Sequence, residues 1–224
     1  HAFTLQPYIG AYSASDSACS ATAPLPPPTA FTCTAAAGSL TITLAWTNGW
    51  TYDSVVIRRN GTVIRTVTGT TTSVTDTPAA PGTYLYELQG VLADQTSALA
   101  PCTVEQTYVA PVTITTCAID ASRAAHLAWT NGAANYDGIT LLVDGAAAAV
   151  SPLAGTATSC DIAGLVPGNH TFSLQPFIGA YKATAALCSA TAPLPPPTGF
   201  TCTVGSSSLF VSLAWTNGWT YETV

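Results

Sequence analysis

The chain has 224 residues, of which 48% are hydrophobic and only 7% are charged, whereas roughly 25% are charged in an ordinary soluble protein. Its 5 basic and 11 acidic side chains give a net charge of −6, so it has no basic patch for nucleic acid or an anionic membrane surface. Its apolar stretches are broken by Pro, Gly or Thr before they reach the ~20 residues of a membrane helix. These values exclude a nucleic-acid-binding protein and a membrane-inserted segment.

The sequence is a repeat within a repeat. The stretch LAWTNGWTY occurs at 44–52 and again at 213–221, and residues 1–55 align with residues 170–224 without a gap. A weaker repeat aligns LAWTNG at 44–49 with the same letters at 127–132, so that Trp46, Trp129 and Trp215 are equivalent. Each long period therefore holds two domains in alternation. We expect the chain to be a window of a longer, covalently continuous array.

In chain order, the predicted segments begin and end with incomplete domains. They are the last strands of a partial β-sandwich (1–23), a Pro-rich linker (24–28), two complete sandwiches (29–109 and 110–191), a Pro-rich linker (192–197) and the first strands of another partial sandwich (198–224). The three consecutive prolines of each Pro-rich linker favour polyproline II, which makes a semi-rigid spacer; a disordered linker is the alternative. The connection at 105–113 has one proline, so stiffer and softer joints should alternate.

The first complete domain has the pattern of an all-β fold. Apolar residues at 40–46 alternate with Thr and Ala, as in a half-buried strand. Residues 54–67 contain two β-rich runs around Asn60-Gly61, which predicts a tight hairpin because both central residues accept φ > 0. A Thr-rich strand, a turn at 81–82, an aromatic strand and a last strand follow. We predict seven strands, no helix and a β-sandwich.

The second complete domain repeats this order. Asp144-Gly145 takes the hairpin position, and Pro167-Gly168 takes the turn before the aromatic strand. The alternation of 40–46 recurs at 209–215 in the last partial segment. The fold class is therefore all-β, as tandem seven-stranded sandwiches.

These features together resemble a known family. A Trp at the end of the second strand, a Tyr-Asp before the third, a hairpin after it and a Pro-Gly turn before an aromatic strand are similar to fibronectin type III-like repeats. The Cys-bracketed variety, found in tandem in very long bacterial surface proteins, is the most similar. The resemblance implies an immunoglobulin-like sandwich that serves in adhesins, spacers or structural fibres. One departure is that no tyrosine stands in the family's usual register after the Pro-Gly turn.

Seven cysteines in this chain indicate an oxidising compartment. The spacing allows two pairings: Cys33 with Cys102 and Cys117 with Cys188 inside each domain, or Cys19 with Cys33 and Cys102 with Cys117 across the linkers. The first is favoured because first and last strands lie on neighbouring edges of a sandwich, and because the resemblance implies it. Such bonds would carry a pulling force past the fold.

Two pairs of surface residues are candidate functional positions. Trp50 and Trp219 follow WTNG in a loop, where Ala133 replaces them in the alternate domain. A loop Trp can stack on a sugar ring, pack on a neighbouring subunit or cover its own core. Asn60 and Asn169 begin Asn-x-Thr sequons on outward turns and are candidate glycosylation sites.

Residues for chemistry are scarce. His1, His126 and His170 have no Cys, Asp or Glu at metal-ligand spacing, and we expect them to be surface or half-buried strand residues. Cys160, which aligns with Val74, should be a buried free thiol. No catalytic motif is present, so we predict no catalytic, cofactor or metal site and no enzyme activity.

The sequence therefore favours a structural repeat protein that self-associates into an extracellular fibre, filament or cell-surface stalk. The alternative is an adhesin or carbohydrate-binding array that uses the loop tryptophans, and an enzyme's accessory spacer comes third. Assembly from chains whose partial ends complete one another is disfavoured, because the two pieces lack the central hairpin and the strand after it. Covalent glycans would supply solubility that the sparse charges do not.

Overall fold

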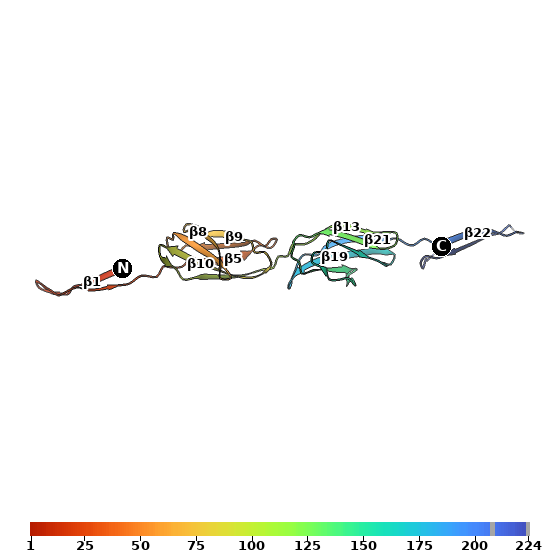
Figure 1. Ribbon diagram of the computed structural model, residues 1–224. Coiled ribbons are helices and arrows are strands. Elements are labelled where there is room, and N and C mark those ends of the chain that lie inside the picture. Colours follow the sequence, from red (N-terminus) through yellow and green to blue (C-terminus); the bar gives the residue numbers. More distant parts are fainter. Residues whose placement is uncertain (207–208, 223–224) are drawn as a thin grey trace. The chain divides into compact units, whose positions relative to one another are not determined.

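The computed structural model describes residues 1–206 and 209–222. Residues 207–208 and 223–224, which belong to the predicted segment 198–224, lie outside the described residues. All regular elements in the described residues are β-strands, as predicted (Figure 1). The chain divides into two compact units, His1–Thr107 and Tyr108–Val224.

The complete domain of the first unit is a sandwich of two antiparallel sheets. One sheet has the order β5-β6-β9, and the other has the order β11-β10-β7-β8 with β12 also paired to β10. The strands are β5 (Thr29–Ala35), β6 (Ile42–Thr47), β7 (Ser54–Arg59), β8 (Thr62–Thr68), β9 (Ser73–Asp76), β10 (Gly82–Leu92), β11 (Gln95–Thr96) and β12 (Ala100–Gln106). Apart from the two-residue β11, these are the seven predicted strands.

The core of this domain lies between the two sheets. Successive side chains of a strand point to opposite faces, so the predicted alternation in 40–46 buries one face of β6. On that face Ile42, Leu44 and Trp46 are buried, while Thr43 is exposed. The facing sheet contributes Val55, Ile57, Tyr86 and Leu88.

Both predicted hairpins are confirmed. Asn60 and Gly61 have φ values of 51° and 79°, and β7 pairs with β8 across them. Asp144 and Gly145 have φ values of 51° and 83° in the same position of the second domain. Positive φ at both central residues is what a two-residue hairpin of type I′ requires.

The second complete domain has the same two-sheet plan. Its sheets have the orders β13-β14-β18 and β16-β15-β19-β20, with β17 paired to β15 and β21 to β19. The strands are β13 (Thr113–Ile119), β14 (Ala125–Thr130), β15 (Gly138–Val143), β16 (Ala146–Ala147), β17 (Leu153–Ala154), β18 (Ser159–Ile162), β19 (Gly168–Ile178), β20 (Tyr181–Lys182) and β21 (Ala186–Ala192). Its core is made by Leu127, Trp129, Ile139, Leu141, Phe172 and Leu174, with five smaller or peripheral members.

The two domains differ in the strand after the hairpin. The first domain has the seven-residue β8, whereas the second has only the two-residue pieces β16 and β17. The first sequence, TVIRTVT, is rich in β-branched residues, whereas the second is alanine-rich and contains Pro152. Alanine has low strand propensity and proline cannot donate a ladder hydrogen bond, which explains the interruption.

The partial segments contain only a few paired strands each. The first has β1 (Ala2–Leu5) paired with β4 (Ser17–Ser20), and β2 (Tyr8–Ile9) paired with β3 (Tyr12–Ser13). The last has β22 (Thr198–Val204) paired with β23 (Val211–Thr216). All six residues of β23 are exposed, including the apolar Val211, Leu213 and Trp215.

Candidate functional site

The disulfides join the first strand of each complete domain to its last. Cys33 of β5 is bonded to Cys102 of β12, and Cys117 of β13 is bonded to Cys188 of β21. In both domains these two strands lie side by side although they belong to different sheets. Of the two pairings that the spacing leaves open, the structure has the one inside each domain.

The other described cysteines are unpaired. Cys19 and Cys202 are exposed in the partial segments, and Cys160 is half-buried against the second core. Burial raises the pKa of the Cys160 thiol, and the nearby Asp161 carboxylate adds to this shift. A raised pKa leaves little thiolate at neutral pH, so Cys160 is an inert packing residue.

The predicted linkers are partly built into the domains that follow them. Leu25, in the predicted linker 24–28, is buried in the core of domain 29–109. Val109, predicted to end that domain, is buried in the core of the next one. The connections before the two complete domains are therefore anchored by Leu25 and Val109, whereas Leu194 in the predicted linker 192–197 is exposed.

In each domain a tyrosine hydroxyl also holds the backbone of the linker that precedes that domain. The hydroxyl of Tyr52 donates to the carbonyl oxygen of Pro26 at 2.7 Å, and that of Tyr136 donates to Ala110 at 2.7 Å. The hydroxyl of Tyr221 donates to the equivalent carbonyl, that of Pro195. These bonds were not predicted. Their signal in the sequence was the last letter of LAWTNGWTY, which aligns with Tyr136.

The glycine of the same motif leaves space for the linker backbone. A Cβ on Gly49 would lie 2.2 Å from the carbonyl oxygen of Pro27, and one on Gly132 would lie 2.3 Å from that of Pro111. Real Cβ atoms do not approach so closely, so only glycine fits. The repeated motif thus encodes both a core strand and the seat of the linker.

The asparagine of the motif bridges a core tryptophan to a neighbouring loop. In the first domain the Trp46 indole donates to Asn48 at 2.9 Å, and the Asn48 amide donates to the Gly69 carbonyl at 2.8 Å. In the second domain Trp129 Nε1 and Asn131 Oδ1 are buried without a hydrogen-bond partner. The motif therefore has the same letters but a looser polar bridge there.

The two candidate loop tryptophans are both solvent-accessible. Trp50 is 58% exposed and Trp219 is 39% exposed. The guanidinium of Arg123 lies 5.0 Å from the centroid of the Trp219 ring. An exposed indole of this size is available for stacking on a ring or a cation.

The two candidate glycosylation residues are exposed. Asn60 lies in the hairpin turn, and its side-chain oxygen accepts a hydrogen bond from the Leu85 amide at 2.9 Å. Asn169 lies in β19, and its oxygen accepts a longer bond of 3.5 Å from the Thr191 hydroxyl. Both sequons are accessible, and Asn169 is held less tightly.

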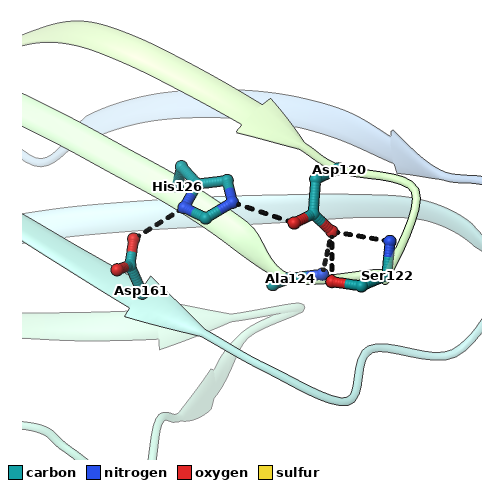
Figure 2. A network of polar contacts seen from close by, with 5 residues as sticks. All are labelled: Asp120, Ser122, Ala124, His126 and Asp161. Carbon is teal, nitrogen blue, oxygen red and sulfur yellow. Dashed lines mark hydrogen bonds and ion pairs between the residues drawn. The ribbon is translucent and has the colours of Figure 1, made fainter.

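His126 lies between two carboxylates on the outer face of its sheet (Figure 2). Its Nδ1 is 2.8 Å from Asp161, and its Nε2 is 3.2 Å from Asp120. Asp120 also accepts from the Ser122 hydroxyl at 2.7 Å and from the Ala124 amide at 2.9 Å. The exposed strand position of His126 agrees with the prediction. Its two acidic neighbours were missed because they come from a turn and from β18.

This cluster shifts the pKa of both kinds of group. Hydrogen bonds to Asp161 and then Asp120 raise the pKa of His126. The Ser122 hydroxyl, the Ala124 amide and His126 hold the pKa of Asp120 below its ordinary value. The carboxylates approach opposite nitrogens of the ring, so they do not converge on one point. Within residues 1–206 and 209–222 no group of three or more His, Cys, Asp or Glu side chains is placed to hold a metal ion.

The prediction for His170 was wrong. Its side chain is buried, with Nε2 2.8 Å from the Val166 carbonyl oxygen and Nδ1 2.7 Å from Asp144. In the first domain the aligned Tyr84 donates to the carbonyl of Ala80, also four residues upstream, at 2.7 Å. Tyr84 in one domain and His170 in the other therefore close the same corner, each through a hydrogen bond to the carbonyl oxygen four residues upstream.

Comparisons with known proteins bear on the fold alone. No family model and no curated protein matches the sequence. The two-domain fibronectin type III segment of chicken tenascin has a TM-score of 0.62 at 16% identity, covering 74% of this chain and 99% of that one. The fibronectin(III)-like modules of Clostridium thermocellum CbhA have a TM-score of 0.35 at 18% identity, covering 70% and 87% of the two chains. The complete domains have the fibronectin type III fold.

No helix in the described residues is long and apolar enough to cross a membrane.

Proposed function

We propose that this chain, a tandem of disulfide-bonded fibronectin type III-like domains, is a load-bearing segment of an extracellular fibre or cell-surface stalk. The observation that carries the proposal is the position of the disulfides. The chain enters each complete domain through its first strand and leaves through its last, and the Cys33–Cys102 and Cys117–Cys188 bonds join those two strands. A pulling force then passes through a covalent bond and bypasses the fold.

The same bonds stabilise the domains against unfolding. They close loops with sequence separations of 69 and 71 residues. In the chain-entropy model a loop of this length contributes about 4 kcal/mol, by restricting the unfolded chain. This is a large share of the 5–15 kcal/mol that is typical of a domain. Disulfide-bonded domains suit an oxidising compartment, in which disulfides persist.

The anchored linkers support a mechanical role. Leu25 and Val109 pack into the cores of the domains that follow, and the Tyr52 and Tyr136 hydroxyls hold the adjoining backbone. A linker whose backbone is held against one domain has fewer free torsions than a flexible tether, which favours the transmission of force. A spacer that only separates two other domains needs no such anchoring.

Self-association and glycosylation complete the proposal. With 7% charged residues the surface has little electrostatic repulsion to keep copies apart, which favours lateral packing in a fibre. Sugars on the exposed Asn60 and Asn169 would restore solubility where copies do not pack. The chain acts as a scaffold and not as an enzyme. Turnover of a polysaccharide or peptide that is lost on changing one Asp or His would contradict this.

Single-molecule stretching of the chain from its two ends tests the load path. In the oxidised state the residues between each pair of bonded cysteines should not extend. Reduction should release about 230 Å more per complete domain, because about 69 residues extend by roughly 3.4 Å each. Cys160→Ser is the matched control and should leave both traces unchanged. Equal extension before and after reduction would remove the basis of the proposal.

A second function, a carbohydrate-binding array, is favoured by one observation. Trp50 is 58% exposed in a loop, and a flat exposed indole can stack on a sugar ring. Binding to a panel of immobilised glycans should then be lost in Trp50→Ala. Binding that is absent, or that survives this change, would leave the structural role alone.

A further inference from the structure

The loop tryptophan and an arginine meet inside the second compact unit. Trp219 follows β23, and Arg123 lies in the turn between β13 and β14. The guanidinium carbon is 5.0 Å from the centroid of the indole ring, within the ~6 Å range of a cation–π contact. Trp219 is 39% exposed, although the strands of its segment are exposed along their length. Trp50, the equivalent residue of the first complete domain, is more exposed, at 58%.

The turn that carries Arg123 is fixed by local hydrogen bonds. The Arg123 amide donates to the Asp120 carbonyl at 3.0 Å, and the Leu165 amide donates to the Arg123 carbonyl at 3.2 Å. The Asp120 carboxylate ties down Ser122 and Ala124 on either side (Figure 2). Arg123 itself has a φ of 65°, a region that a non-glycine residue occupies only when its surroundings hold it there.

One nitrogen of the Arg123 guanidinium makes no hydrogen bond. Arg123 Nη1 is buried and has no hydrogen-bond partner among the described residues. A buried donor without a partner is unfavourable in an apolar surrounding. The face of an indole supplies the compensating attraction, because its negative quadrupole faces the cation.

One domain type carries the arginine of this pair, and the other carries the tryptophan. Domain 110–191 has Arg123 in the turn and Ala133 in the loop. Domain 29–109 has Leu40 at the position that aligns with Arg123, and it has Trp50 in the loop. A domain with the arginine is followed along the chain by one with the tryptophan, and the joint between them contains the three-proline linker. Turn and loop are therefore complementary at one kind of joint and not at the other.

We propose that the turn 120–124 is a docking site for the loop tryptophan of the neighbouring domain. Arg123 binds Trp219 by stacking on its ring, and Trp50 is the same docking group for a second copy of this turn. Every second joint of the array is then locked by an Arg–Trp pair, while the alternate joint is not. The inference depends on the alternation of the two domain types and not on fibre formation.

Fluorine NMR of the 224-residue chain labelled with 5-fluorotryptophan tests the first half. The signals are assigned by their loss in Trp219→Ala, Trp50→Ala and Trp129→Phe. Arg123→Gln should move the Trp219 signal and leave the Trp50 and Trp129 signals in place, the latter showing that the domain remains folded. A Trp219 signal that does not move would overturn the proposal.

A reciprocal measurement keeps the test valid if Arg123→Gln disturbs the turn. Trp219→Ala leaves domain 110–191 unchanged in sequence, and it places in the loop the residue that Ala133 provides naturally. The Arg123 Nε–Hε signal should lose its ring-current shift in this variant. An Arg123 signal identical in both proteins contradicts the stacking.

The second half predicts contact between copies when Arg123 is free. In Trp219→Ala the Trp50 signal should shift as the chain concentration rises into the millimolar range. The double variant Trp219→Ala/Arg123→Gln should show no such shift. A Trp50 signal that is independent of concentration, or that shifts equally in both variants, refutes this half. The stretching experiment depends on the disulfides alone, so either proposal can fail without the other.

Discussion

Gly69 leaves no room for a side chain. A Cβ on it would lie 1.8 Å from the carbonyl oxygen of Tyr52, and Gly155 has the same relation to Tyr136. Gly69→Ala must therefore push the backbone away from the tyrosine that holds the linker. Overpacking of this kind typically lowers the free energy of unfolding by about 1–3 kcal/mol. We expect a loss of at least about 2 kcal/mol here, because the backbone fixes both the new Cβ and the Tyr52 carbonyl oxygen, so neither can move aside by a change of rotamer.

The matched control is Gly38→Ala. A Cβ on Gly38 meets no atom within 4 Å, so this change should alter the free energy of unfolding by less than about 0.5 kcal/mol. Urea denaturation of both variants measures the difference. If the two variants lose similar amounts of free energy of unfolding, the close contact with Tyr52 is not what restricts position 69 to glycine.

The histidines of the second domain predict a dependence of its stability on pH. The pKa of His126 is raised by Asp161 and Asp120, and the pKa of His170 is raised by the Val166 carbonyl and Asp144. A group with a raised folded-state pKa stabilises the fold below its unfolded pKa, about 6.5, and this contribution is lost as pH rises through the folded value. The urea midpoint of this domain should therefore fall between pH 6 and pH 8.

Variants that restore the residues of the first domain isolate the two histidines. His126→Thr copies Thr43 and should remove part of the fall, and His126→Thr combined with His170→Tyr should remove nearly all of it. Asp120 has a lowered pKa, so its contribution is present above about pH 4 and is lost only on acidification. An unchanged slope in the double variant would mean that other groups carry the pH dependence.

At the scale of single residues, local signals were sufficient only where the structure is local. Asn60-Gly61 predicted its hairpin because a two-residue turn depends on those two residues alone. The partners of His126 could not be predicted, because Asp161 becomes a neighbour only through the pairing of β14 with β18. Burial of His170 likewise depends on the fold of the corner that it closes.

At the scale of elements, the tyrosine of each linker seat fixes a loop as well as the linker. The Tyr136 hydroxyl donates to the Ala110 carbonyl and accepts from the Gly132 and Ala133 amides at 2.9 and 3.1 Å. Tyr136→Phe removes all three bonds without changing the ring. We expect a loss of about 1–2 kcal/mol and faster hydrogen exchange at the Gly132 and Ala133 amides.

Tyr84→Phe serves as the control for this prediction. It also removes one hydroxyl bond to a backbone carbonyl, that of Ala80, but it lies in the other domain. Exchange at Gly132 and Ala133 should be unaffected. If those two amides exchange at the same rate in Tyr136→Phe as in the original chain, the tyrosine does not hold the loop.

The strands were predicted better than the connections between them. Period-2 alternation in 40–46 follows from burial of one face, so it is visible in the sequence. The four prolines in 24–28 predict a stiff connection, but composition does not show what the connection touches. Leu25 packs into the core of the domain that follows it. The space that it fills exists only once the two sheets of that domain have packed together, so the sequence does not reveal it.

At the scale of the whole molecule, the alternation of domains was evident because the repeat copies long stretches of sequence. The cysteine pairing was not, since the distance along the chain is compatible with bonds inside a domain or across a linker. It is decided by closure of each sandwich, which brings β5 beside β12 and β13 beside β21. Pairing is thus a property of the folded domain and not of the spacing.

Each complete domain has its own core and its own disulfide, with no residue in common between the two cores. We therefore expect the domains to unfold in separate transitions. Cys33→Ala/Cys102→Ala should destabilise domain 29–109 by about 4 kcal/mol, from the loss of a 69-residue loop closure, and leave the second transition unchanged. Cys117→Ala/Cys188→Ala should destabilise the second domain and leave the first transition unchanged.

NMR-monitored urea denaturation, with one core signal per domain, separates the two transitions. Loss of both transitions in either variant would mean that the pair unfolds as one cooperative unit, and the array would then yield in blocks larger than a domain.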